Sequence, residues 1–173
     1  MNNPHQQLIQ QIDLMLRARY PLLYIVGVEE EAIEQVLQQL TQTSQTPRQL
    51  LLWDIVTGWD DNGTDKGSVM GALSRITKTP ENTTTSLVLR EIHFILKNYD
   101  TEKNAHLILA IKNLTRQLKL TRQTLILTSH TLIIPPEIQD EITFIYFPLP
   151  NIQFFDYLIH ELIVPVKLNL IGL

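Results

Sequence analysis

The feature that most constrains this chain is a series of five short apolar segments, separated by patterns of helical spacing and by polar turns. The segments cover residues 20–26, 50–56, 86–92, 124–129 and 142–147. Their hydrophobic residues are nearly continuous rather than alternating, which is typical of strands buried on both faces of a parallel sheet. Strands that alternate with helices indicate a layered arrangement. The sequence therefore predicts an α/β fold with a doubly wound sheet.

Two of the intervening segments carry apolar residues at helical spacing, and these residues should face the sheet. They are Ile33, Val36, Leu37 and Leu40 in the first crossover, and Leu107, Ile111, Leu114 and Leu118 in a later one. Residues 6–19 predict a further amphipathic helix, which should end before Tyr20-Pro21 because proline restricts the residue that precedes it. The linkers 41–47, 58–67 and 77–85 are polar and rich in turn residues, so we predict surface loops there.

Composition bounds the class of protein. The chain has 173 residues, of which 44% are hydrophobic, and this is enough for residues 1–173 to form a single domain around one core. A net charge of −4 argues against general attraction to nucleic acid or to an anionic membrane. Cysteine is absent, which excludes disulfides and thiolate metal sites. No apolar run approaches the roughly 18 residues of a membrane span, and no secretory signal is recognisable, so we expect a cytoplasmic location.

The turn after the first apolar segment is where an open parallel sheet usually cradles phosphate. Here it reads GVEEEAIE, from Gly27 to Glu34, with one glycine, no lysine and four carboxylates. A phosphate loop would carry a second glycine and a lysine that neutralises the phosphates. Because clustered negative charge repels a triphosphate, we predict that this turn does not bind ATP.

Two explanations of these glutamates remain open. The helix dipole stabilises acidic residues in a first turn, by a few tenths to about 1 kcal/mol each. A pair of carboxylates could instead bind a divalent cation, although adjacent residues on a helix diverge by about 100°.

The ends of the third and fourth apolar segments give a second test of nucleotide chemistry. ATPases of the RecA type end the corresponding strand with an Asp for magnesium and a Glu for the attacking water. Arg90 and Glu91 stand there instead, so Glu91 either polarises a water or forms a local ion pair. Thr128 or Ser129 would take the place of a γ-phosphate sensor, although hydroxyls are common at strand ends. We expect no enzyme activity and no cofactor, with Glu91 and Thr128 as the candidate catalytic residues.

The histidines show no spacing typical of a metal site, and the sequence predicts no metal. Among the five, only His93 and His130 fall at predicted strand ends. Because central strands lie side by side, these two could converge near Glu91 at the carboxyl edge of the sheet, where a Zn²⁺ site is one possible arrangement. The string GTDKGS, from Gly63 to Ser68, contains phosphate-loop residues in the wrong order, and we interpret it as a loop leading into a helix.

A basic stripe recurs along the later helical segment. Its members are Lys112, Arg116, Lys119 and Arg122, at spacings of four, three and three. It is either a solvated face or a docking surface for an acidic partner or a nucleic-acid backbone. It lacks the interleaved aromatic residues that single-strand binding favours.

The last segment, residues 151–173, is unusually apolar and predicts a helix followed by an apolar tail. Phe154, Leu158 and Leu162 would lie along one helical face. A helix that is apolar over most of its girth requires more than one neighbour, so we predict that this segment lies at an interface.

Six stretches of the chain resemble, in order, the N-terminal region of an AAA-type ATPase family of cyanobacteria and algal plastid genomes. They cover residues 17–31, 53–59, 88–96, 111–119, 124–130 and 142–150. In that family this region lacks the phosphate loop and precedes a second region that carries the ATPase machinery. The resemblance implies a three-layer RecA/AAA-like fold, a five-stranded parallel sheet in the order 5-1-4-3-2 and a degenerate nucleotide site. Family members usually carry Asp at the position of Glu91.

For function, the resemblance implies a non-catalytic AAA-like domain that mediates protein association or regulation, in a cyanobacterial cytosol or plastid stroma. We expect a protein partner or self-association, and we expect neither membrane, nucleic acid nor ATP as a partner. The alternative is a weak nucleotide-binding ATPase subunit that acts with a partner or in an oligomer. It would use Glu91 and Thr128, with an arginine such as Arg116 or Arg122 supplied to a neighbour.

Overall fold

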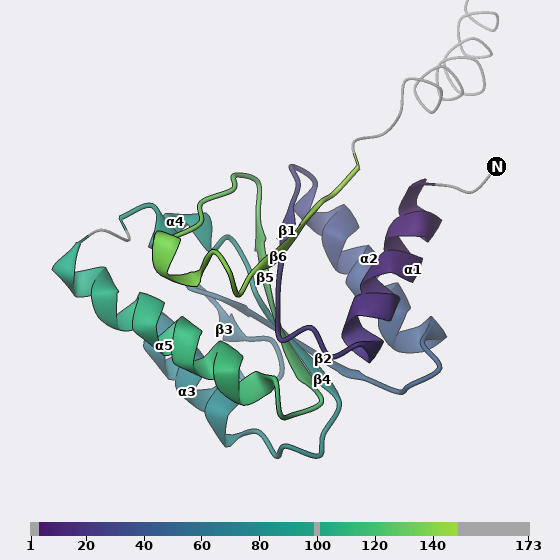
Figure 1. Cartoon of the computed structure of the whole chain (residues 1–173), viewed down its shortest axis with the longest axis horizontal. Coiled ribbons are helices and arrows are strands. Elements are labelled where there is room, and N and C mark those ends of the chain that lie inside the picture. The colour runs from purple at the N-terminus through teal and green to yellow at the C-terminus, as the bar shows by residue number, and fades with distance from the viewer. Residues whose placement is uncertain (1–3, 99–100, 149–173) are drawn as a thin grey trace, which may run out of the picture.

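A six-stranded sheet lies at the centre of the computed structural model, which describes residues 4–98 and 101–148 (Figure 1). The strand order is β3-β2-β4-β5-β1-β6. The strands are β1 Leu22–Val26, β2 Gln49–Asp54, β3 Gly58–Trp59, β4 Thr85–Leu89, β5 Gln123–Ser129 and β6 Thr143–Tyr146. All neighbours pair in parallel except β2 and β3. The five predicted strands are therefore present in the predicted order 5-1-4-3-2. The prediction of a five-stranded parallel sheet is wrong in the number of strands, because β3 adds a sixth, antiparallel strand at one edge.

Helices cover both faces of the sheet and make three layers (Figure 1). Helices α1, Pro4–Arg17, and α2, Glu30–Thr43, lie on one face. Helices α3, Val69–Lys78, and α5, Glu102–Leu118, lie on the other. Helices α2 and α5 bury the apolar stripes that their helical spacing predicts, one on each face of the sheet. The three-layer α/β arrangement is therefore confirmed.

The central strands owe their continuous apolar sequences to this double coverage. β1, β4 and β5 are buried along their whole length. Successive side chains of a strand point to opposite faces. Leu23 and Ile25 of β1 accordingly pack in the core beneath α1 and α2, whereas Leu22 and Tyr24 pack in the core beneath α3 and α5.

The predicted surface loop 58–67 is wrong at its start, because Gly58 and Trp59 form strand β3. Trp59 pairs antiparallel with Trp53 of β2 and is only 1% exposed. The guanidinium carbon of Arg75 lies 5.0 Å from the centroid of the Trp59 ring. A two-residue strand is too short to show a periodic pattern. Because its neighbours in the sequence are polar, the burial of Trp59 could not be predicted. The whole of GTDKGS, residues 63–68, is a loop as predicted, and the Ser68 hydroxyl caps α3 by accepting from the Gly71 N–H.

The interpretation of the last apolar segment as a strand buried on both faces is also wrong. β6 lies at the end of the sheet order and pairs with β1 alone among the described strands. Phe144 is 50% exposed and Tyr146 62% exposed, and their rings contact each other edge to face. Only the opposite face of β6 contributes to the core, through Ile145.

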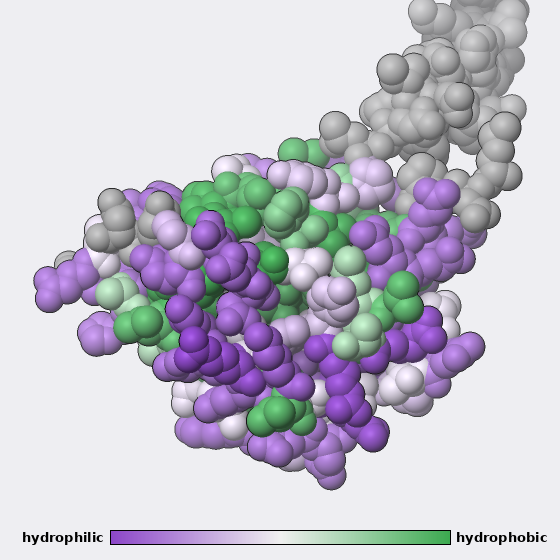
Figure 2. All heavy atoms as spheres, viewed as in Figure 1, coloured by the Kyte–Doolittle hydropathy of each residue, from purple (hydrophilic) through white to green (hydrophobic). Residues whose placement is uncertain are grey.

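The carboxyl ends of the parallel strands meet along one edge of the sheet, beside the short helix α4, His93–Leu96 (Figure 1). A 3-10 turn, η1 Pro136–Ile138, lies between β5 and β6. Figure 2 shows hydrophobic residues gathered over α4 and the chain that follows β5, in the upper part of the view. The lower part, over α3 and the end of α5, is mostly hydrophilic. On the face shown, hydrophobic residues are thus concentrated toward the carboxyl edge.

Candidate functional site

The candidate site is a cavity of about 360 Å³ at the carboxyl edge of the sheet. The ends of β2 and β4, the start of α2 and helix α4 supply its walls. Its lining residues are Glu30, Asp54, Ile55, Val56, Arg90, Glu91, Phe94 and Ile95. The cavity therefore combines three carboxylates and one guanidinium with four apolar side chains.

Gly27 lies in the turn after β1, where it leaves room for a neighbouring side chain. A Cβ at this position would lie 2.6 Å from the Cβ of Phe147. The Gly27 N–H donates to the carbonyl of Ser129 at 2.9 Å, and the Phe147 N–H donates to the carbonyl of Val26 at 2.7 Å. The turn is thus held between β5 and the end of β6, and its glycine makes room for a buried phenylalanine.

The glutamates after Gly27 open helix α2, as the helix-dipole explanation requires. Glu30 and Glu31 stand in its first turn, and Glu29 is the N-cap without a side-chain cap. Burial raises the pKa of Glu30, and the negative charge of Glu91 raises this pKa further. The electrostatics of the site therefore disfavour any additional anion beside Glu30.

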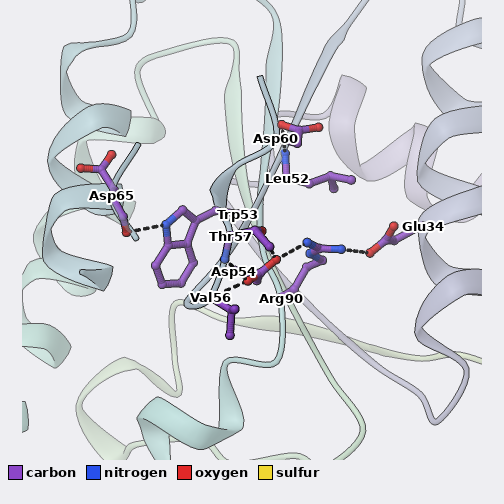
Figure 3. Close-up of polar contacts among 9 residues, drawn as sticks. All are labelled: Glu34, Leu52, Trp53, Asp54, Val56, Thr57, Asp60, Asp65 and Arg90. Atoms are coloured by element: carbon purple, nitrogen blue, oxygen red, sulfur yellow. Dashed lines mark hydrogen bonds and ion pairs between the residues drawn. The ribbon is translucent and has the colours of Figure 1, made fainter. Parts of the chain in front are cut away.

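Arg90 occupies the middle of the site and binds two carboxylates (Figure 3). Its guanidinium donates to Glu34 Oε1 of α2 at 2.7 Å and to Asp54 Oδ2 at the end of β2. All three side chains are about one-fifth exposed. Burial lowers the pKa of Arg90, but the hydrogen bond that Arg90 donates to Glu34 and the charges of both partners outweigh this effect and raise the pKa.

Asp54 also organises the turn that follows β2 (Figure 3). Its Oδ1 accepts from the N–H groups of Val56 and Thr57, both at 2.7 Å, and its Oδ2 accepts from the Thr57 hydroxyl at 2.5 Å. Burial raises the pKa of Asp54, but these hydrogen bonds and the charge of Arg90 prevail, so that the pKa lies below its usual value. Asp54 is therefore ionised and fixed.

Glu91, His93 and His130 come together beside this cavity. The Glu91 Oε2 atom lies 3.5 Å from Nδ1 of His93 and 3.5 Å from Nδ1 of His130. The two imidazole rings are 4.2 Å apart, edge to face. Burial lowers the pKa of His93, and so does the nearby His130. His93 and His130 therefore do converge near Glu91, as their positions at predicted strand ends allowed.

The two hydroxyls at the end of β5 do not line the cavity. The Ser129 hydroxyl donates to the carbonyl of Thr131 at 2.6 Å and accepts from the Thr131 N–H at 3.0 Å. Thr128 is 2% exposed and does not line the cavity, and its Oγ1 has no hydrogen-bond partner among residues 4–98 and 101–148. Neither hydroxyl is presented to a ligand in the cavity.

The predicted basic stripe does not continue along one helix, because α5 ends at Leu118. Lys112 and Arg116 lie on α5, and Lys119 at its end binds Glu141 at 2.6 Å. Arg122 instead lines a separate cavity of about 330 Å³ at the amino edge of the sheet. Its other lining residues are Leu16, Arg17, Arg19, Thr46, Arg48 and Thr84. Sequence reasoning missed this cluster of arginines, because they precede three different strands.

The predicted interface residues Phe154, Leu158 and Leu162 lie outside the described part of the chain. Within the described part, no helix combines the length and the apolar character that a membrane crossing needs.

Comparison with known proteins agrees with this architecture. The chain is 31% identical over 147 residues to the AAA domain-containing protein ycf46 of Guillardia theta, and 30% identical over 141 residues to that of Trieres chinensis. These alignments cover 83% and 79% of the chain but only 28% and 27% of the relatives, so the chain spans about a quarter of their length.

A solved structure of C. elegans PCH-2 has a similar fold, with a TM-score of 0.53 at 8% identity, over 94% of this chain and 47% of that one. Residues 8–147 match the family described as SpoVK-like AAA ATPase, N-terminal domain. This match includes every described strand and the whole candidate site. The chain therefore belongs to the family of SpoVK-like AAA ATPase N-terminal domains.

Proposed function

We propose that this domain does not process nucleotide but binds and regulates the ATPase region of its own family through the carboxyl edge of its sheet. The observation that carries the proposal is the ion triad of Arg90, Glu34 and Asp54. A nucleotide site at this edge needs uncompensated positive charge for the phosphates and free carboxylates for magnesium. Here the single cation, Arg90, is paired with two carboxylates, so no positive charge is left uncompensated.

The rest of the edge supports the same conclusion. The turn after β1 carries glutamates in place of a lysine, and the side chain of Phe147 fills the space beside its glycine, Gly27. The site is therefore degenerate for ATP in both charge and shape, and we infer that the domain is not an enzyme.

The rim of the cavity favours a protein ligand. Val56 is 77% exposed, Phe94 58% and Ile55 45%. Apolar side chains around a paired polar centre are typical of protein interfaces, where polar groups fix orientation and apolar groups supply most of the binding energy. The carboxyl edge thus presents the right chemistry for a partner of mixed polar and apolar character.

The family to which the chain belongs suggests which protein binds at the carboxyl edge. The matched description is that of an N-terminal domain of an AAA ATPase, and the relatives are about three to four times as long as the region they share with this chain. We therefore infer that the ATPase region is the partner. The corresponding location would be a cyanobacterial cytosol or plastid stroma.

The first experiment titrates the chain with fluorescent ATP plus Mg²⁺ to millimolar concentration and follows anisotropy. We expect no saturable binding. Saturable, magnesium-dependent binding that is lost in Glu91→Gln would overturn the proposal in favour of the alternative, a weak nucleotide-binding subunit.

A second experiment measures the ATPase rate of the family's ATPase region with and without this domain. We expect the domain to change the rate and Val56→Glu to abolish that change. Leu120→Glu is the matched control, because Leu120 is 84% exposed but lies just beyond α5, near the amino edge of the sheet. Equal effects of the two variants would count against the carboxyl edge as the contact surface.

A further inference from the structure

We propose that Glu91, His93 and His130 form a Zn²⁺ site at the carboxyl edge of the sheet. This inference does not depend on the proposed function, because it concerns a different ligand. Three residues from three places in the fold contribute: the end of β4, the start of α4 and the end of β5.

The spacing of the donor atoms fits a metal better than a hydrogen bond. One Glu91 oxygen lies 3.5 Å from each of the two Nδ1 atoms, and one donor atom of each residue lies within 4.8 Å of the others. An N–H···O hydrogen bond is usually about 2.7–3.2 Å long. Zinc bonds of about 2.0–2.2 Å in a tetrahedron place neighbouring ligands about 3.3–3.6 Å apart. The two separations between Glu91 and the histidines agree with the tetrahedral edge.

His93 supplies an independent sign of a missing partner. The residue is 7% exposed, and its Nδ1 has no hydrogen-bond partner among the described residues. Buried polar atoms are nearly always paired, since an unpaired one costs about 1–3 kcal/mol. The ring is packed between Phe94 and His130, with centroid distances of 4.1 Å and 4.2 Å. A metal bound at Nδ1 would satisfy this buried atom.

The backbone holds two of the ligands in place. Glu91 has φ of 52°, a left-handed conformation that is uncommon for residues other than glycine and recurs at functional sites. The following residue, Ile92, donates its N–H to the carbonyl of Thr128 at 3.1 Å, which ties the ends of β4 and β5 together. The segment that bears His130 is fixed because Tyr24 and Ser129 both donate to the carbonyl of Thr131.

The donor set selects the class of metal. Two imidazole nitrogens and one carboxylate oxygen suit Zn²⁺ and similar transition metals, whereas Mg²⁺ and Ca²⁺ prefer oxygen ligands alone. Three protein ligands leave a fourth position of the tetrahedron open. The His130 side chain is 50% exposed, so this position is reachable by water or by a carboxylate of a bound protein.

The test is a calorimetric titration of the untagged, EDTA-treated chain with Zn²⁺, in parallel with Mg²⁺. We expect one Zn²⁺ per chain with a dissociation constant of micromolar or below, and no response to Mg²⁺. Replacement by Co²⁺ should give the intense visible bands of a four-coordinate site. Weak bands of octahedral cobalt, or no saturation by 100 μM Zn²⁺, would overturn the proposal.

Variants separate this site from casual binding at surface histidines. His130→Ala and Glu91→Gln should each weaken Zn²⁺ binding at least tenfold. His106→Ala is the control, because His106 is exposed on α5 and should have no effect. Circular dichroism checks that the variants fold. We expect His130→Ala to fold normally, because the His130 side chain is half exposed. Unchanged affinity in His130→Ala, or equal losses in His130→Ala and His106→Ala, would refute the site.

Discussion

The guanidinium of Arg90 binds the carboxylate of Glu34 at 2.7 Å, although the two residues are 56 positions apart in the chain. This contact joins the end of β4 to helix α2, and the second contact of Arg90, with Asp54, joins both to the end of β2. Three elements of the fold thus share one charged junction at the carboxyl edge of the sheet, where open parallel sheets usually bind ligands.

Arg90→Met should lower the free energy of unfolding by about 2 kcal/mol, because it leaves two partly buried carboxylates without their counter-ion. Urea denaturation measures this change. Arg17→Met is the matched control, since Arg17 pairs with Asp13 in the i,i+4 arrangement but is 46% exposed. That variant should cost at most about 0.5 kcal/mol. Equal losses in the two variants would show that the junction adds nothing beyond a surface ion pair.

Asp54 should make stability depend on acid. Its pKa is lowered in the folded state, so its contribution is complete above the unfolded pKa of about 3.9 and is lost as pH falls through the folded value. The difference in unfolding free energy between the wild type and Asp54→Asn should therefore be constant from pH 7 to about pH 5 and shrink below about pH 4. Denaturation at a series of pH values checks this. A difference that stays constant into acid would contradict the assignment.

Gly27→Ala should destabilise the domain by about 1–3 kcal/mol, as overpacking of a core typically does. The new Cβ would lie 2.6 Å from the Cβ of Phe147, an atom that cannot move without its backbone. At Gly71 the corresponding contact is the Asp65 Oδ1 atom at 2.5 Å, the movable end of a side chain. Gly71→Ala should therefore change stability by less than about 1 kcal/mol, because the helix gains from alanine. Thermal unfolding of both variants tests the contrast.

Nucleic-acid binding should be absent. Of the basic side chains predicted as a stripe, Lys119 is already paired with Glu141, and Arg122 lies in another cavity. Anisotropy of a labelled oligonucleotide at 50 mM and 200 mM salt is the measurement. Saturable binding that falls steeply with salt, and that disappears when Arg116 and Lys119 are changed to Glu, would reinstate the stripe as a nucleic-acid surface.

The parallel sheet was predictable because its central strands are buried on both faces, and burial on both faces leaves a continuous apolar run such as Leu22–Val26. Its order came from the family resemblance. β3 was not predictable, since two residues carry no period. The helical stripes of α2 and α5 were predictable for the same reason as the strands, namely that the side chains facing the core are mostly apolar.

The candidate site was predictable only in part. The lack of a phosphate loop and the position of Glu91 at a strand end could be inferred from local sequence. The partners of Arg90 could not, because Glu34 and Asp54 are brought to it by the order of the strands. The contact between His93 and His130 likewise requires β4 and β5 to be neighbours in the sheet. This relation follows from the topology and cannot be read from the spacing of the histidines in the sequence.

The two cavities at opposite ends of the strands make the domain electrically polar along the strand direction. Four arginines surround the cavity at the amino edge, while Glu29, Glu30, Glu31 and Glu91 gather at the carboxyl edge. A molecule of this kind carries a permanent dipole that its net charge of −4 does not reveal. In an encounter the field would turn the carboxyl edge toward a positively charged surface before any contact forms, and this steering would weaken as salt shortens the range of the field.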